Sequence, residues 1–270
     1  MKIKMFRPAV LLLALAMLAG CKNRSGDPNH IRVGITSGPE SALAEAARKE
    51  ALEKYNLEVE LVAFNDYVMP NEALQSGDVD VNVFQHIPYL EEQSRQRGYK
   101  LEVVGRTFVY PIAAYSKKVK TIRELEAGST VVIPNDPTNG GRALLLLQQS
   151  GLLQLRGDKG LLPRVNDITG NPRQLNILQV EASQIPRILD DKDIAMAVIN
   201  NNFAIQAGLT GGEYEVLKED KASPYVNVIV AREDNRDAEK VKKFVKAYQS
   251  EAVEAAAKEI FKNGAVKGWE

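Results

Sequence analysis

The chain has 270 residues, and its 35 basic and 35 acidic residues balance, so no overall field favours nucleic acid or anionic lipid as a partner. One cysteine excludes an internal disulfide, and with only two histidines the chain lacks the spacing of a cysteine–histidine zinc site. We therefore expect no metal, no cofactor and no nucleic acid.

The first 20 residues have the pattern of a signal peptide. A basic start precedes an apolar run over 9–19, shorter than the about 20 residues of a membrane-spanning helix. The run ends in Leu18-Ala19-Gly20-Cys21, which is typical of a bacterial lipobox, and we predict cleavage before Cys21 and lipidation of its thiol. The alternative is an ordinary secretory signal with a cysteine near its cleavage site. Both interpretations place the rest of the chain outside the cytoplasm.

A polar tether over 21–30 follows the signal peptide. One cysteine carrying several acyl chains suffices to hold a soluble domain on a membrane. We expect a lipid-anchored protein of the cell envelope that faces the periplasm. Lys22 stands where an aspartate is the usual signal for retention at the inner membrane of Gram-negative cells, so the choice between inner and outer membrane stays open.

Strands and helices alternate through the first half of the chain. The segment 31–35 alternates as a half-buried strand, and a helix from about Glu40 places Leu43, Ala47 and Ala51 on one face. With the next strand they form a βαβ unit, which requires a right-handed crossover. The predicted elements that follow are a strand over 57–64, a helix over 70–77, a strand over 81–84, a helix over 87–98 and a β-rich segment over 101–115.

The second half repeats this alternation, so each half is expected to build its own parallel sheet. Its predicted elements are strands over 130–133, 175–180, 194–199 and 225–231, helices over 139–150 and 184–189, and one long amphipathic helix over 238–261. An irregular tail over 264–269 is expected to pack Trp269 onto the body.

Two extended crossovers, near Pro111 and near Tyr225, divide this α/β chain into two lobes. Lobe 1 is predicted to comprise 31–112 and 226–270, and lobe 2 to comprise 113–225. Lobes joined in this way form a clamshell that holds a ligand at the carboxyl ends of strands from both sheets. With a lipid anchor this is the outline of a transport binding protein, although enzymes are built on similar plans.

Candidate ligand-binding residues of lobe 1 follow two predicted strands. Alternation along the strand places Asn82, Phe84 and His86 on one face. Tyr89 comes three residues later, and Tyr67 lies just past the preceding strand. We predict that Phe64, Tyr67, Phe84 and Tyr89 line an apolar slot, while an ordinary core position is the alternative for Phe64 and Phe84. His86 follows the strand and precedes a helix start, which favours a place in the site.

Candidate residues of lobe 2 lie where strands give way to helices. The segment 135–142 opens a helix, where backbone N–H groups favour an anion and Arg142 can bind a carboxylate through two parallel hydrogen bonds. A helix cap with a solvated Arg142 is the alternative. Asn200 and Asn202 either cap the next helix or bind a ligand, and Asn227 in the second crossover can touch both lobes.

Several motifs together resemble the methionine-binding lipoproteins of the MetQ/NlpA family, the solute-binding components of a methionine ABC transporter. The matches run from the lipobox to the end of the chain, and they are specific as a set although none is so alone. They are Phe64-Asn65-Asp66-Tyr67, Pro70-Asn71-Glu72-Ala73-Leu74, Phe84-Gln85-His86, Tyr99-Lys100-Leu101, Pro134-Asn135-Asp136-Pro137-Thr138-Asn139, Gly141-Arg142-Ala143-Leu144, Ser223-Pro224-Tyr225-Val226-Asn227 and Gly264-Ala265-Val266-Lys267-Gly268-Trp269.

The resemblance implies a type II fold like that of periplasmic binding proteins, with L-methionine, D-methionine or a derivative as ligand. It implies delivery to the permease and ATPase subunits of an ABC importer. The side chain of the ligand would be held by Tyr67, Phe84, His86 and Tyr89. Its carboxylate and ammonium would be held by Arg142, Asn202 and Asn227, with Asn139 and Asn200 as further candidates.

The sequence suggests two alternative classes of function. An esterase or amidase would use His86 as base, but no glycine-x-serine-x-glycine elbow is present, so we expect no enzyme. The second alternative is a lipoprotein paralogue with a structural or host-contact role, or a binder of a methionine derivative or peptide.

Overall fold

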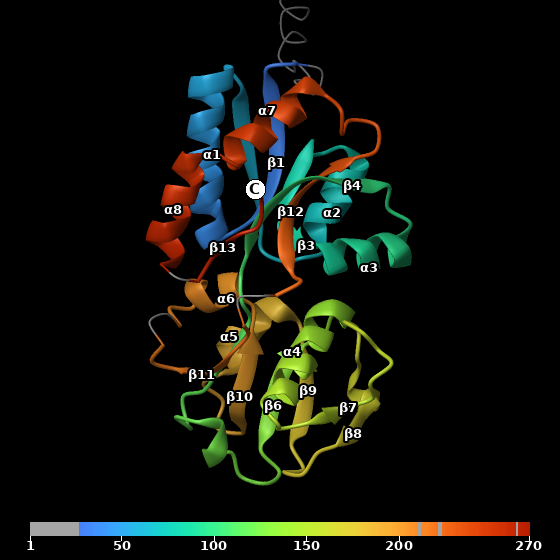
Figure 1. Ribbon diagram of the computed structural model, residues 1–270, viewed down its shortest axis with the longest axis vertical. Helices are drawn as coiled ribbons and strands as arrows, with labels where there is room; N and C mark the ends of the chain where they lie inside the picture. The colour runs from blue at the N-terminus through green and yellow to red at the C-terminus, as the bar shows by residue number, and fades with distance from the viewer. Residues whose placement is uncertain (1–26, 210–211, 221–222, 263) are drawn as a thin grey trace, which may run out of the picture.

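The computed structural model describes residues 27–209, 212–220, 223–262 and 264–270. The predicted signal peptide and Cys21 lie outside this part of the chain. Figure 1 shows two bodies, each built around one sheet and joined by extended segments. Across the described residues, no helix combines the length and the apolar character that crossing a membrane requires.

The first sheet has six strands in the order β13-β4-β12-β3-β1-β2. Its strands are β1 (His30–Thr36), β2 (Glu58–Phe64), β3 (Val81–His86), β4 (Leu101–Val109), β12 (Val226–Arg232) and β13 (Val266–Lys267). The strands β2, β1 and β3 are parallel, as predicted, but β12 runs antiparallel to both β3 and β4. The prediction of a purely parallel sheet is therefore wrong. The chain returns from the second sheet through β12, which enters the first sheet at the edge where β3 and β4 end.

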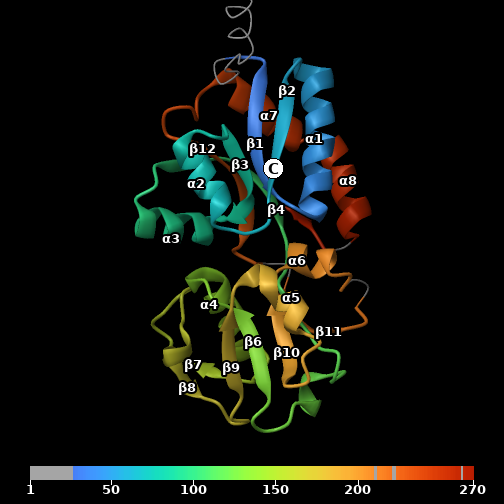
Figure 2. The ribbon, with the colours of Figure 1, turned by 180° about the vertical axis from the view of Figure 1, so that it is seen from behind.

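Helices cover both faces of this sheet (Figures 1 and 2). Alternation along β12 sends Ile229 and Ala231 to one face and Val228 and Val230 to the other. The first face packs against α1 (Pro39–Tyr55), α7 (Glu239–Tyr248) and α8 (Glu251–Phe261), and the second packs against α2 (Met69–Ser76) and α3 (Ile87–Arg97).

The long helix predicted over 238–261 is wrong, because the chain breaks into α7 and α8. Ser250 starts the second helix by accepting a hydrogen bond from the backbone N–H of Val253. A serine in this cap position competes with continued helix, and the apolar periodicity on either side conceals the break.

The second sheet has five strands in the order β11-β5-β10-β6-β9, and it is mixed as well, since β5 runs antiparallel to β10 and β11. Its strands are β5 (Ala113–Tyr115), β6 (Thr130–Pro134), β9 (Asn176–Val180), β10 (Ile194–Ile199) and β11 (Glu215–Lys218), and a small hairpin joins β7 (Gln154–Leu155) to β8 (Ile168–Gly170). The helices are α4 (Pro137–Gln149), α5 (Ile185–Ile188) and α6 (Asn201–Gln206), with short 3₁₀ turns at Ile122–Glu124, Val165–Asp167 and Ala182–Gln184.

The chain passes between the two sheets once after β4 and once before β12. The tail lies beside the first of these passages, because β13 pairs with Val109 and Phe108 of β4. Trp269 packs edge-on against Phe108 with ring centroids 4.8 Å apart, which confirms the predicted contact but replaces the irregular tail by a short strand. The composition of the two sheets supports the predicted lobe boundaries, which we retain as a proposal.

Candidate functional site

One pocket lies at the carboxyl ends of parallel strands from both sheets, where β1, β3, β6 and β10 give way to helices. The space between its side chains, counted together with the part that is open to solvent, measures about 390 Å³. All nine residues predicted to bind a ligand line this pocket: Tyr67, Phe84, His86, Tyr89, Asn139, Arg142, Asn200, Asn202 and Asn227. Their role in binding stays a prediction.

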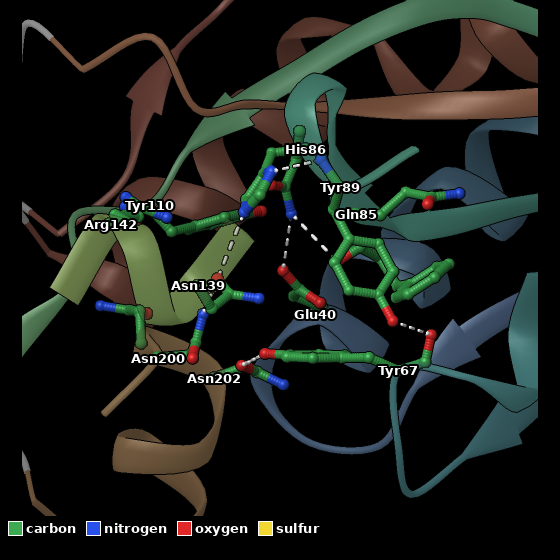
Figure 3. A pocket seen from close by; sticks show the side chains of 13 residues that line it. Glu40, Tyr67, Gln85, His86, Tyr89, Tyr110, Asn139, Arg142, Asn200 and Asn202 are labelled. Carbon is green, nitrogen blue, oxygen red and sulfur yellow. Dashed lines mark hydrogen bonds between the residues drawn. The ribbon is translucent and has the colours of Figure 1, made fainter. Parts of the chain in front are cut away.

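Aromatic rings form one side of the pocket (Figure 3). The ring centroids of Tyr67, Phe84 and Tyr89 are 6.0 Å apart in each of the three pairs, and Phe203 from the second sheet approaches Tyr67 to 4.9 Å. The Tyr89 hydroxyl donates to the backbone carbonyl of Tyr67 at 2.9 Å, so it is not directed at the pocket. The result is a rigid apolar slot. Phe64 was predicted to line it as well, but that prediction is wrong, because Phe64 packs against a core cluster of the first sheet instead.

His86 ends β3 and caps α3, and it is buried. Its Nδ1 accepts from the backbone N–H of Tyr89 at 3.1 Å, so we assign the ring proton to Nε2, which donates to Asn139 Oδ1 at 3.2 Å. Burial and the nearby charge of Arg142 lower the pKa of His86 to about 3. The imidazole is therefore neutral at physiological pH and serves as a fixed donor across the two sheets.

The N-terminus of α4 is capped by the carboxylate of Asp136. The carboxylate of Asp136 accepts from the backbone N–H groups of Thr138 and Asn139 at 3.2 and 2.9 Å and from the Asn139 side-chain amide. The helix cap offered as an alternative is therefore present, and it occupies the amides predicted to hold a ligand anion. The Asn139 Oδ1 is left on the pocket side, where Asn200 donates to it at 2.7 Å.

Arg142 lies one turn further along α4 and is buried, which excludes the alternative of a solvated side chain. Its Nε donates to Glu219 at 3.0 Å, and its Nη2 donates to Glu219 and, at 2.9 Å, to the carbonyl of Tyr110. The guanidinium also stacks over the Tyr225 ring at 4.2 Å. These contacts hold Arg142 firmly, and within the described part of the chain Nη1 has no hydrogen-bond partner.

Amide side chains complete the pocket and join its two sides. The Tyr67 hydroxyl donates to Asn202 Oδ1 at 2.5 Å, which links the loop after β2 to α6. Asn227 on β12 donates to the carbonyl of Phe84 at 3.4 Å. Among the described residues, the buried Asn200 Oδ1 and Asn202 Nδ2 have no hydrogen-bond partner. Buried polar atoms of this kind require a partner, and both residues line the pocket.

Comparison with known proteins shows which family the chain with this pocket belongs to. The family described as NlpA lipoprotein matches residues 31–269. The chain belongs to the NlpA lipoprotein family. A curated relative, the D-methionine-binding lipoprotein MetQ of Escherichia coli K12, is 58% identical over 268 residues, which is 99% of each chain. Lipoprotein 28 of the same strain is 53% identical over 97% of this chain and 96% of its own.

Solved structures of this lipoprotein family share the fold. The crystal structure of a methionine-binding protein MetQ superposes with a TM-score of 0.89 at 60% identity, covering 90% of this chain and all of the other. A nutrient-binding protein of Burkholderia cenocepacia, solved bound to methionine, superposes with a TM-score of 0.86 at 44% identity, covering 88% of this chain and all of the other. These matches confirm the predicted two-lobed fold, the family resemblance and the prediction of a binding protein rather than an enzyme.

Four further residues line the pocket of this NlpA lipoprotein and were not predicted: Glu40, Gln85, Tyr110 and Asn201. Glu40 is the one charged residue among them. Glu40 lies in the first turn of α1, where acidic residues commonly stabilise a helix through its dipole while exposed to solvent. The sequence therefore does not show that this carboxylate is buried. The clue was its place directly after a strand, at the same edge as His86 and Asn139.

The described residues contain no group of three or more histidine, cysteine, aspartate or glutamate side chains that could hold a metal ion.

Proposed function

We propose that this protein is a membrane-anchored solute-binding lipoprotein that captures free methionine between its two lobes and delivers it to an ABC importer. The observation that carries the proposal is the lining of the pocket. It joins an aromatic slot to a fixed arginine and a ring of amides, within a chain whose relatives include a protein solved bound to methionine.

The aromatic slot suits a thioether. Each contact of sulfur with a ring edge contributes about 0.3–1.5 kcal/mol, and Tyr67, Phe84 and Tyr89 offer three rings that their mutual packing holds in place. The hydrogen bond from the Tyr89 hydroxyl to the Tyr67 carbonyl fixes the orientation of the Tyr89 ring in this slot.

The polar side suits the carboxylate of an amino acid. Arg142 Nη1 is the unoccupied end of a buried guanidinium, and Asn202 Nδ2 is a second free donor in the lining of the same pocket. Hydrogen bonds between charged groups are stronger than neutral ones, and a rigid donor loses little entropy on binding. We assign the ligand carboxylate to Arg142 and Asn202, with Asn139, Asn200 and Asn227 as surrounding amides.

Binding would favour the closed arrangement of the lobes. Tyr67, His86 and Asn227 belong to the proposed lobe 1, whereas Arg142 on α4 and Asn202 on α6 belong to lobe 2, so only a closed protein offers both sets at once. A ligand shifts the equilibrium by its extra affinity for that form, which is the form an ABC permease would recognise. Lipidation of Cys21 would hold the protein at the membrane that carries the permease and its ATPase subunits.

The test is calorimetric titration of the full chain, purified in detergent and freed of carried-over ligand by unfolding and refolding. L-methionine comes first and D-methionine second, because the Escherichia coli MetQ relative is named for binding the D form. Saturable binding that is lost in Asn227→Ala and Arg142→Ala would support the proposal. No binding of any methionine form by refolded protein would refute it and would favour a structural or host-contact role.

A further inference from the structure

The short helix α6 of the second body lies against the first body. Figures 1 and 2 both show it between the two sheets. Its Phe203 ring packs on Tyr67 at 4.9 Å, Ile205 packs on the core cluster of the first sheet, and the helix contacts α1. The two bodies therefore meet at α6 through direct contacts between protein side chains.

Gln206 is the last residue of α6, and it contacts the loop that follows β1. Its side-chain amide donates to the backbone carbonyl of Ser37. A Cβ on Gly38 would lie 2.5 Å from Gln206 Nε2 and 2.7 Å from Gln206 Cγ, so only glycine leaves the space that this side chain occupies. The described residues that line the pocket include Asn202 but neither Gln206 nor Gly38. This contact therefore joins the two bodies outside the pocket.

The loop that receives Gln206 is fixed within the first body. Ser37 donates its backbone N–H to the Phe64 carbonyl at 2.9 Å and its hydroxyl to Asn65 Oδ1 at 2.9 Å. Gly38 has a φ of 113°, a conformation that favours glycine, and α1 begins directly after it. The Ser37 carbonyl therefore has a defined direction in the first body, and a donor on the second body can reach it only when the two bodies are close.

We infer that Gln206 is a positioning residue that holds α6 against the loop after β1 and stabilises the closed arrangement of the two bodies. Asn202 lies four residues earlier on the same face of α6, so it belongs to the unit that Gln206 fixes. A contact that exists only in the closed form raises the closed fraction, and it slows opening once a ligand is enclosed. The inference goes beyond the proposed function, and only its effect on methionine release rests on that function.

The experiment measures the distance between two spin labels, one on each body, in the ligand-free chain. Exposed leucines accept the labels through Leu52→Cys on α1 and Leu178→Cys on β9, and Cys21→Ser removes the single natural thiol of the full chain. Gln206→Ala should lower the ratio of closed to open protein by about 2- to 10-fold, because one hydrogen bond is lost. In the unlabelled chain, the same variant should release radiolabelled methionine faster by a similar factor, while the association rate stays within about twofold.

Two further variants separate closure from other effects. Gln249→Ala is the matched control, because Gln249 also donates from an exposed amide to a backbone carbonyl, that of Arg106, but within the first body. It should change neither the closed-to-open ratio nor the release rate. Gly38→Ala should have the effect of Gln206→Ala, because the new methyl group displaces the Gln206 side chain. The two substitutions together should then lower the closed-to-open ratio no further than Gly38→Ala alone.

An unchanged closed-to-open ratio and an unchanged release rate in Gln206→Ala would overturn the inference. Additive losses in the double variant would also overturn it, because Gly38 and Gln206 would then act independently. If the ligand-free chain is open throughout, faster release from Gln206→Ala would support the inference and unchanged release would overturn it. Failure of the unchanged chain to bind methionine would refute the proposed function. The label distances would still decide the role of Gln206 in that case, since a chain that never closes would overturn it.

Discussion

Replacing Arg142 separates its structural role from its proposed binding role. Arg142 and Glu219 form an ion pair in which the side chains are only 4% and 12% exposed. Breaking a buried pair from one side costs about 3–5 kcal/mol because the remaining charge stays desolvated, and the partial exposure of Glu219 places Arg142→Met near 3 kcal/mol. In a chain of this size, that loss lowers the melting temperature by roughly 6–12 °C.

The double variant Arg142→Met, Glu219→Gln removes both charges. Apolar or neutral replacements of buried pairs are often close to neutral in stability, so we expect recovery to within about 1 kcal/mol of the unchanged chain. Methionine binding should not recover, because no guanidinium remains to hold the carboxylate. Glu219→Gln alone should retain binding.

The assay is urea unfolding of the ligand-free chain together with calorimetric titration of all three variants. Equal stability of Arg142→Met and the unchanged chain would contradict the buried-pair argument. Recovery of methionine affinity in the double variant would refute the assignment of the carboxylate to Arg142, whatever the stability data show.

Three further predictions concern other parts of the molecule. Burial raises the pKa of Glu40 in the folded chain to about 7, above its unfolded value of 4.5, so the ligand-free fold loses stability as the pH rises from 4.5 to 7. Glu40→Gln should therefore be about 3 kcal/mol more stable than the unchanged chain at pH 8 in urea unfolding. Tyr67→Phe removes the 2.5 Å bond to Asn202 and should weaken methionine binding about 5- to 15-fold in calorimetry, whereas unchanged affinity would show that this bond adds nothing to closure. A Cβ at Gly268 would lie 2.6 Å from a backbone oxygen of β4, so Gly268→Ala should lose about 1–3 kcal/mol in thermal unfolding while Gly157→Ala, with open space around it, should not.

Much of the fold could be predicted from the sequence because its elements carry strong periodicity. The alternating strands and the helices between them are buried on defined faces, so their patterns survive in the sequence. The direction of β12 could not be predicted, because a strand's residues do not show which way it enters a sheet. The break between α7 and α8 was missed because apolar spacing continues across it and one serine decides it.

The pocket could be predicted to a similar degree. Residues at the carboxyl ends of strands must meet at one edge, and this rule brought His86, Asn139 and Asn200 together. It did not specify which of their atoms face the ligand. The amides at the start of α4 were expected to bind an anion, yet Asp136 occupies them, because a cap from within the chain satisfies the same donors.

Glu40 shows why the remaining residues of the pocket could not be predicted from the sequence. In a sequence, an acidic residue in the first turn of a helix is explained by the helix dipole, and only its place shortly after a strand indicates burial. Only the packing of β1, β12 and the aromatic slot around that turn reveals a carboxylate without a counter-charge. Such a group lowers the stability of the ligand-free fold, because its charged form is desolvated without a counter-charge. The stability that Glu40→Gln gains in urea unfolding should therefore be complete above pH 7 and absent below pH 4.5, and a gain that does not depend on pH would contradict the burial argument.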